Sequence, residues 1–373
     1  MANIIICIPD DYSTGGLQRS AINIHQALVC KGHVVSILSI KLAKDGYARK
    51  FSFIKQISPN YSSKIFFWLF FALNFRKVLK TNKNSVFLAL GLMPTIFLSL
   101  FSVGLKVRGM IGSERIFPPM ETPSFLIRSI RKVFYRRLDF IVSQSEASLL
   151  WFRDHLGLPE TMLEIIPNVI HPPSVQFNNS IDSGIRPGAY KNNYPLIACV
   201  GRLTSQKGFD CALQIFSIIH KRKPLAKMHI VGEGPDRKAL GVLAHSLHIE
   251  DDITFISKIE DLTEIWQSAD ILLFPSRYEG FPNVLAEAMA HGLPAVSFNC
   301  LTGPSDLINH GENGYLVDVG DVICASELTV RLLEHHDLRN QLGSRAMNVA
   351  VKFSPNVIGD KWSSLIQRVS SKP

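Results

Sequence analysis

The hydrophobic pattern along the chain alternates between two kinds of segment. Short apolar runs of strand length, such as Asn3–Pro9 and His33–Ile40, are separated by Gln18–Val29, where apolar residues recur at helical spacing. The second half repeats this order, with the strand Leu196–Val200 followed by the helix Phe209–His220. Strands that alternate with helices predict α/β domains in which parallel sheets are covered by helices.

A change of composition divides the chain into two parts. Residues 171–193 are rich in Pro, Ser, Asn and Gly and show no periodicity, which is typical of a linker between domains. The 373 residues suit two domains of ordinary size. We expect an N-terminal domain over residues 1–172, a C-terminal domain over residues 194–353, and a helix within residues 354–373 that packs back on the first domain.

The stretch Val86–Leu105 contains no charged residue and is long enough to cross a membrane. Gly91 and Pro94 interrupt it, however, and divide it into an apolar run of strand length and a shorter helical segment. We therefore expect a strand and a helix of a doubly wound domain here, with a membrane-spanning helix as the alternative.

Composition and charge narrow the class of protein. With 46% hydrophobic and 19% charged residues the chain is globular rather than disordered. Residues 1–180 carry 21 Lys and Arg against 10 Asp and Glu, a net +11, whereas residues 181–373 carry 19 against 21, a net −2, which together give +9. A basic first half favours an anionic partner, with a well-solvated surface as the alternative, and the absence of a nucleic-acid-reading motif favours a membrane or a phosphorylated substrate over nucleic acid.

Two basic segments of the first half leave their role open. Ile65–Leu73 is rich in aromatic residues and flanked by lysines, so it suits either an amphipathic helix on an anionic bilayer or an ordinary core helix. The second segment suits either lipid phosphate or a solvated helix face, and its basic residues are Arg128, Arg131, Lys132, Arg136 and Arg137. The six cysteines lack C-x-x-C spacing and no secretory signal precedes the first strand, which indicates a cytoplasmic protein.

A strand, loop, helix and strand follow one another between Ile271 and Phe298. Asn283 is placed to cap the helix, and Gly292 to end it in a left-handed conformation. Because the helix opens where a strand ends, its free N–H groups point toward a ligand crevice. Glu279 in the loop and Glu287 in the mostly apolar helix are eight residues apart, and we interpret both as ligand contacts rather than idle surface charges.

A second loop carries cations at a comparable position. Arg202 follows the strand Leu196–Val200, and Lys207 stands just before the next helix. Two cations at a helix N-terminus can hold a diphosphate, whereas a surface turn with incidental charges is the alternative. The chain has no Asp-x-Asp motif, and its histidines show no metal-ligand spacing, so the sequence offers no obvious metal site.

The string Glu-Gly-Phe-Pro-Asn-Val-Leu-Ala-Glu from Glu279 to Glu287, together with Gly-Arg-x-x-x-x-Lys-Gly from Gly201 to Gly208, resembles the signature of retaining glycosyltransferases of family 4. The resemblance implies the GT-B fold, in which two Rossmann-like, doubly wound parallel-sheet domains face a cleft. It implies catalytic roles for Glu279, Arg202 and Lys207. The implied donor-binding residues are Gly15, Gly16, Gly232, Lys258, Gly280, Phe281, Pro282, Asn283 and Glu287, and Glu114 and Arg115 are implied on the acceptor side.

The resemblance further implies what the protein does. It predicts retaining, metal-independent transfer of a hexose or N-acetylhexosamine from a nucleotide sugar, with a uridine diphosphate sugar as the usual donor, and no cofactor. The acceptor is expected to be a lipid-linked or polysaccharide glycan of bacterial surface polysaccharide biosynthesis, reached at the inner face of the cell membrane through the basic N-terminal domain. A nucleotide-sugar epimerase of the same architecture and a binding protein without activity are the alternatives.

Overall fold

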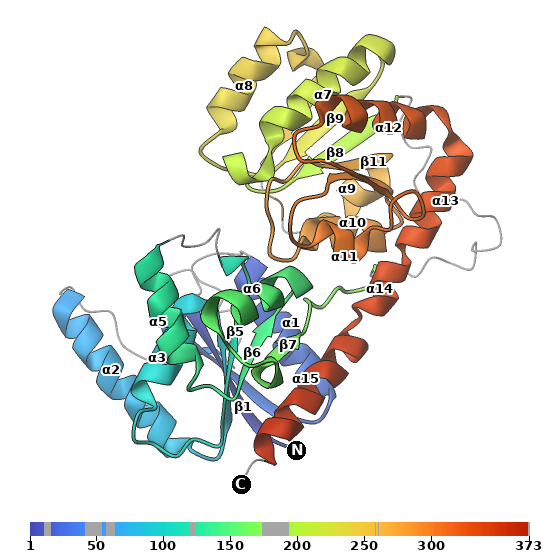
Figure 1. The fold of residues 1–373 in the computed structure, drawn as a ribbon. Coiled ribbons are helices and arrows are strands. Elements are labelled where there is room, and N and C mark those ends of the chain that lie inside the picture. Colours follow the sequence, from blue (N-terminus) through green and yellow to red (C-terminus); the bar gives the residue numbers. More distant parts are fainter. Residues whose placement is uncertain are drawn as a thin grey trace. The chain divides into compact units, whose positions relative to one another are not determined.

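The computed structural model describes residues 1–10, 16–41, 54–56, 64–118, 124–173, 194–257, 259 and 261–371. Internal contacts divide the chain into two units, Met1–Val169 with Pro355–Pro373, and Ile170–Ser354. Each unit is a parallel sheet with helices on both of its faces (Figure 1). The predicted linker lies outside the described residues from residue 174 onward.

The sheet of the first unit has seven strands in the order β3-β2-β1-β4-β5-β6-β7, and all its pairings are parallel. The strands are β1 (Asn3–Asp10), β2 (Val34–Lys41), β3 (Ile54–Gln56), β4 (Val86–Leu90), β5 (Gly109–Ser113), β6 (Phe140–Ser143) and β7 (Leu163–Ile165). The helices are α1 (Gly16–Cys30), α2 (Lys64–Thr81), α3 (Leu92–Phe101), α5 (Phe125–Tyr135), α6 (Glu146–Leu156), the 3-10 turn η2 (Glu160–Met162) and α15 (Pro355–Ser370). Strand order reverses between β1 and β4, as in doubly wound folds.

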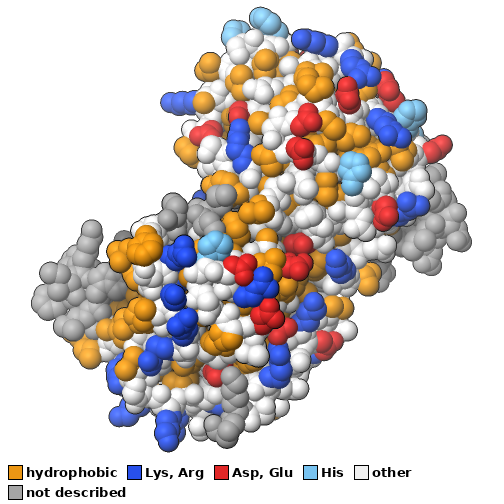
Figure 2. Space-filling view, viewed as in Figure 1, with side chains coloured by type: hydrophobic (Ala, Val, Ile, Leu, Met, Phe, Trp, Pro, Cys, Tyr) orange, Lys and Arg blue, Asp and Glu red, His pale blue; other side chains and the backbone are white. Residues whose placement is uncertain are grey.

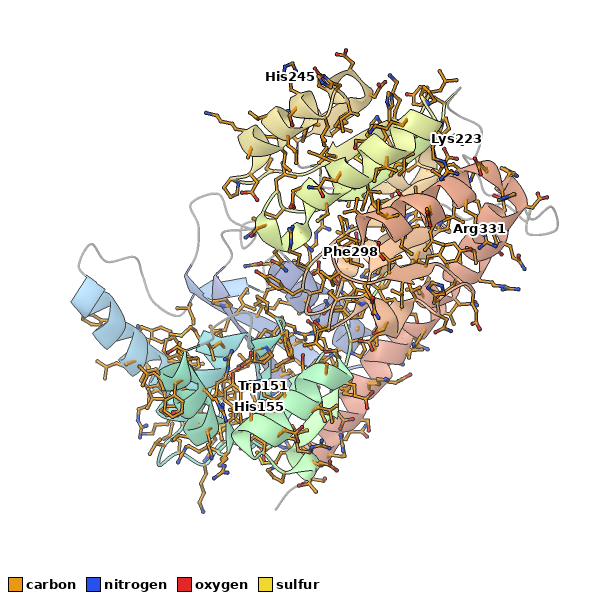
Figure 3. All side chains as sticks on the ribbon, turned by 45° about the horizontal axis from the view of Figure 1, so that its top comes forward. Trp151, His155, Lys223, His245, Phe298 and Arg331 are labelled. Atoms are coloured by element: carbon orange, nitrogen blue, oxygen red, sulfur yellow. The ribbon has the colours of Figure 1, made fainter. Side chains whose placement is uncertain are left out.

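The sheet of the second unit has six strands in the order β10-β9-β8-β11-β12-β13, again all parallel. They are β8 (Leu196–Val200), β9 (Lys227–Val231), β10 (Ile253–Ile256), β11 (Ile271–Phe274), β12 (Ala295–Phe298) and β13 (Tyr315–Val317). The helices are η4 (Ser205–Lys207), α7 (Phe209–Arg222), α8 (Arg237–Ser246), η5 (Glu250–Asp252), α9 (Thr263–Ser268), α10 (Asn283–Ala290), α11 (Pro304–Leu307), α12 (Val322–Glu334), α13 (His336–Ala346) and α14 (Asn348–Lys352). Phe298, labelled in Figure 3, is a buried member of this core.

The uncharged stretch forms two elements, as its Gly and Pro residues predict. Strand β4 is buried along its whole length, and after Gly91 the chain turns into α3. Gly91 has a positive φ of 92°, which suits a residue without a side chain. Among the helices of the described residues, none combines the length and apolar character that a membrane span requires.

The aromatic side of α2 belongs to the core over the residues whose side chains are described. Phe71 and Phe75 are fully buried and stack with ring centroids 5.6 Å apart. Phe70 and Leu73 are exposed on the same helix. The core interpretation therefore holds for the buried face, whereas the side chains of residues 64–69 lie outside the description.

Helix α15 packs against α1 although the two are far apart in sequence. Trp362 and Leu365 are completely buried, and Gly359 lies so close to α1 that a Cβ there would be 3.2 Å from the carbonyl oxygen of Ala27. The side chains of His33 and Ser363 are hydrogen-bonded at 2.9 Å. The C-terminal helix is thus part of the first unit.

One local expectation for the second unit is wrong. Asn283 is the first residue of α10 rather than its cap; Pro282 occupies the cap position, and its side chain has no atom that accepts a hydrogen bond. Gly292 does end α10 with a left-handed φ of 74°, as predicted.

A buried ion pair attaches α5 to the end of β5. Arg131 donates from Nε and Nη2 to the two carboxylate oxygens of Glu114 at 2.9 and 3.0 Å, and Tyr135 donates to the same carboxylate. Burial, reinforced by the Glu114 charge, raises the pKa of Tyr135 well above its ordinary value, so its hydroxyl stays a donor. Arg131 therefore does not belong to a basic surface, contrary to the expectation from sequence. Trp151, which stacks on His155 in α6 (Figure 3), covers the guanidinium.

We predict that Arg131→Met destabilises the protein by about 3–5 kcal/mol, because it leaves the Glu114 carboxylate buried without its partner. The double variant Arg131→Met with Glu114→Gln should recover part of this loss. Thermal unfolding measures both effects. Lys132→Met, which removes an exposed charge from the same helix, is the control, and equal losses in Arg131→Met and Lys132→Met would contradict the structural role.

Candidate functional site

The loops that follow β8, β9 and β11 meet at the carboxyl edge of the second sheet, and glycines allow their close approach. A Cβ on Gly232 would lie 1.9 Å from the carbonyl oxygen of Gly201, and one on Gly208 would lie 2.0 Å from that of Pro275. Gly232 and Gly208 also have positive φ angles of 141° and 65°. Because β8 and β11 are neighbours where the strand order reverses, the loops that follow them flank the usual ligand position of such sheets.

An ion pair joins the loop after β8 to the loop after β11. Lys207 Nζ lies 2.5 Å from Oε1 of Glu279, and both side chains are largely buried, with 18% and 6% exposed. The Phe274 ring centroid is 5.5 Å from the ammonium group, and the Thr302 hydroxyl donates to the backbone carbonyl of Glu279. The structure thus brings together two of the three predicted catalytic residues, which are separated by 72 positions in sequence.

Arg277 fixes the same two loops and was not predicted from sequence. Its guanidinium donates two bonds to the Asp210 carboxylate at 2.9 and 2.6 Å and one to the carbonyl of Ser205 at 2.6 Å. Its backbone N–H donates to the carbonyl of Gln206 at 2.8 Å. The hydrogen bonds from Arg277 hold the pKa of Asp210 below its usual value. The available sequence signal was an arginine two residues before Glu279.

Arg202 lies on the same loop as Lys207. Its side chain is exposed and makes no hydrogen bond or ion pair within the described residues. An exposed guanidinium next to a glycine-rich loop is able to contact an anionic ligand at low desolvation cost.

The remaining predicted residues occupy varied environments. Gly280, Pro282 and Asn283 lead into α10, and Glu287 is half-buried one turn along it. Phe281 is 5% exposed and packs edge-to-face on Phe353 with centroids 5.6 Å apart, so its ring contributes to the core.

Of the other predicted donor-binding residues, one belongs to the first unit and two are not described. Gly16 is the exposed first residue of α1 in the first unit, whereas Gly15 and Lys258 lie outside the described residues. Within the part of the chain that the structure describes, no three His, Cys, Asp or Glu side chains group as metal ligands would.

The predicted acceptor-side residues Glu114 and Arg115 are both buried. Both carboxylate oxygens of Glu114 are engaged by Arg131, and Tyr135 donates to Oε1 as well, which gives Glu114 a structural task. Arg115, 9% exposed, hydrogen-bonds Asn168 at 3.0 Å. Their role toward an acceptor stays a prediction.

Comparison with known proteins adds independent information. Residues 184–349 match the family model for "Glycosyl transferases group 1". The chain is 27% identical to an uncharacterized glycosyltransferase of Haemophilus influenzae, covering 95% of this chain and 97% of that protein. It is also 27% identical to an α-1,4-N-acetyl-D-galactosaminyltransferase of Campylobacter jejuni, over 96% of this chain and 97% of that protein. The name of that relative specifies a GalNAc-containing glycan linked to undecaprenol diphosphate as its substrate.

Among solved structures, the Anabaena protein HepE in complex with UDP and glucose superimposes with a TM-score of 0.82 at 16% identity, covering 99% of this chain and all of that one. At 16% identity the similarity to HepE shows a shared fold and does not by itself indicate a shared activity. The two doubly wound units, the matched family model and the full-length relatives together support a glycosyltransferase with the GT-B fold.

Proposed function

We propose that the protein is a retaining glycosyltransferase that moves a hexose or N-acetylhexosamine from a uridine diphosphate sugar to a lipid-linked or polysaccharide acceptor in bacterial surface glycan synthesis. The observation that carries the proposal is the Lys207–Glu279 pair at the carboxyl edge of the second sheet, next to the exposed Arg202. The lipid-linked substrate in the name of the Campylobacter relative supports the acceptor class, and the UDP in the HepE complex supports the donor class.

The chemistry of the proposed reaction explains the need for these charges. When the bond between the sugar and the diphosphate breaks, negative charge grows on the leaving nucleoside diphosphate. In our proposal Arg202 and Lys207 neutralise that charge without a metal ion. Glu279 keeps the Lys207 ammonium in place, because the contact of 2.5 Å between Oε1 and Nζ restricts an otherwise flexible side chain.

In our proposal Glu287 and Glu279 also bind the sugar parts of the donor. Glu287, half-buried on α10, would accept hydrogen bonds from the ribose hydroxyls. Glu279 and the backbone from Gly280 to Asn283 would hold the sugar ring. The acceptor hydroxyl attacks the anomeric carbon on the face from which the diphosphate leaves, and its proton passes to that diphosphate, so the anomeric configuration is retained.

Lys207→Ala and Glu279→Ala are each expected to lower the transfer rate by at least about 10²-fold, because the first removes the cation that stabilises the leaving diphosphate and the second removes the carboxylate that holds this cation in place. Transfer is measured as UDP released in the presence and absence of acceptor; release that depends on acceptor also separates transfer from epimerisation. Lys221→Ala, an exposed lysine on α7, is the control. Near-normal turnover in a folded Lys207→Ala protein would refute the site.

The clamp formed by Arg277 gives a separate prediction. Because Arg277 and Asp210 act as one unit, Arg277→Ala, Asp210→Ala and the double variant should reduce the transfer rate by similar amounts, on the order of tenfold. Additive losses, in which the double variant shows the product of the two single effects, would mean that the two residues act independently.

The first unit offers a surface for membrane contact, which we include in the proposal. Phe125, Leu126 and Val133 on α5 are 79%, 67% and 62% exposed. Figure 2 shows lysine and arginine side chains among hydrophobic ones on the visible face of this unit. Exposed apolar residues beside basic ones are typical of helices that bind anionic bilayers.

We expect Phe125→Ser with Leu126→Ser to weaken binding to vesicles containing anionic lipid by about tenfold or more, since two apolar side chains no longer enter the bilayer. Vesicle co-sedimentation at fixed salt measures this. Val242→Ser, an exposed apolar residue on α8 of the second unit, serves as the control. Unchanged sedimentation of the double variant would exclude α5 as the membrane contact.

A further inference from the structure

Arg115 is a buried cation without an acidic partner among the residues that the structure describes. It lies two residues beyond the carboxyl end of β5 and is 9% exposed. Nη1 donates to Oδ1 of Asn168 at 3.0 Å and, with the Gln144 amide oriented to suit its neighbours, to that side chain at 3.1 Å. Ser20 of α1 also donates to Asn168 at 2.8 Å, so neutral groups from several elements hold the guanidinium.

The other edge of this guanidinium has no hydrogen-bond partner within the described residues. Both Nε and Nη2 are buried and unpartnered. Arg131 uses these same two atoms to bind the Glu114 carboxylate, at 2.9 and 3.0 Å. The unit therefore contains one arginine whose Nε–Nη2 edge holds an anion and a second whose corresponding edge does not.

Other side chains of the first unit also carry a buried polar atom without a hydrogen-bond partner among the described residues. Among them are Trp362, at its Nε1, and Ser113 at the end of β5, at its hydroxyl. The Trp362 ring centroid lies 5.8 Å from the Arg115 Cζ. Burial lowers the pKa of Arg115 to about 9, which still leaves it charged at neutral pH. A buried charge and several buried polar groups without partners are costly, and such costs are commonly retained for function.

We propose that the Nε–Nη2 edge of Arg115 binds a phosphate or carboxylate group, making the carboxyl edge of the first sheet an anion-binding site. The planar fork of arginine matches two oxygens of either group. Since these nitrogens are covered, binding requires the covering groups to shift, as ligand-induced closure does in many enzymes. That the anion belongs to a substrate rests on the proposed function, whereas anion binding itself does not.

The test uses inorganic phosphate as the probe and thermal unfolding of the full chain as the readout. Arg202→Gln with Lys207→Gln forms the background, which removes the cations proposed to bind phosphate in the second unit. In this background, saturating phosphate should raise the melting temperature by about 5 °C. Adding Arg115→Met should abolish the rise, while adding Arg137→Gln, which removes an exposed charge from the same unit, should preserve it.

A second variant keeps the test informative if Arg115→Met folds poorly. Asn168→Asp brings a carboxylate to a position 3.0 Å from Nη1, so it should raise the melting temperature without phosphate and weaken the response to phosphate. The proposal is overturned if phosphate gives no rise in the background protein. It is also overturned if the rise survives both Arg115→Met and Asn168→Asp, because the anion would then bind elsewhere.

Two binding measurements in the otherwise wild-type protein identify the source of the anion. If it belongs to the acceptor, Arg115→Met should raise the KM for the acceptor about tenfold or more and leave the affinity for UDP unchanged. If it belongs to the donor, the affinity for UDP should fall instead. Loss of phosphate binding with normal transfer would leave the proposed function intact and remove only the link between this site and the substrate.

Discussion

Parallel strand pairing is the constraint on which the rest of this structure depends. Because all strands of each sheet run in one direction, every loop that follows a strand emerges at the same edge. In the second unit this brings residues 207 and 279 together, although 72 positions separate them. The approach is so close that Gly208 and Gly232 tolerate no side chain. The placement of the charged groups therefore depends on the backbone geometry of these loops.

Three arginines differ in how deeply their side chains are buried and in the charge of their partners. Arg131 is fully buried and neutralised by Glu114, and it fastens a helix. Arg277 is partly exposed and joins two loops through Asp210. Arg115 is buried, and its partners within the described part of the chain are all neutral. Since a buried charge without a counter-charge costs stability, the third arrangement is the one that packing alone does not explain.

The sequence predicted the elements well where the pattern is strong. Strands such as β1 and β8 and the division between β4 and α3 agree with the structure because apolar run length and Gly or Pro interruptions determine them locally. What failed depends on tertiary contacts. The burial of Arg131 could be predicted only with the knowledge that Glu114, 17 positions away in sequence, lies against it in the structure. The site loops were predicted, but the pairing of Lys207 with Glu279 and the clamp of Arg277 on Asp210 were not, because no local pattern links residues so far apart.

The position of α15 has a consequence for how the chain acquires its structure. The first unit is assembled from both ends of the sequence, and Trp362 and Leu365 fill a part of it that residues 1–169 cannot fill themselves. The second unit, by contrast, is one continuous segment. Because α15 follows the second unit in the sequence, the surface of α1 that it covers stays exposed until the whole second unit has been synthesised, so the unit begun earliest is completed last.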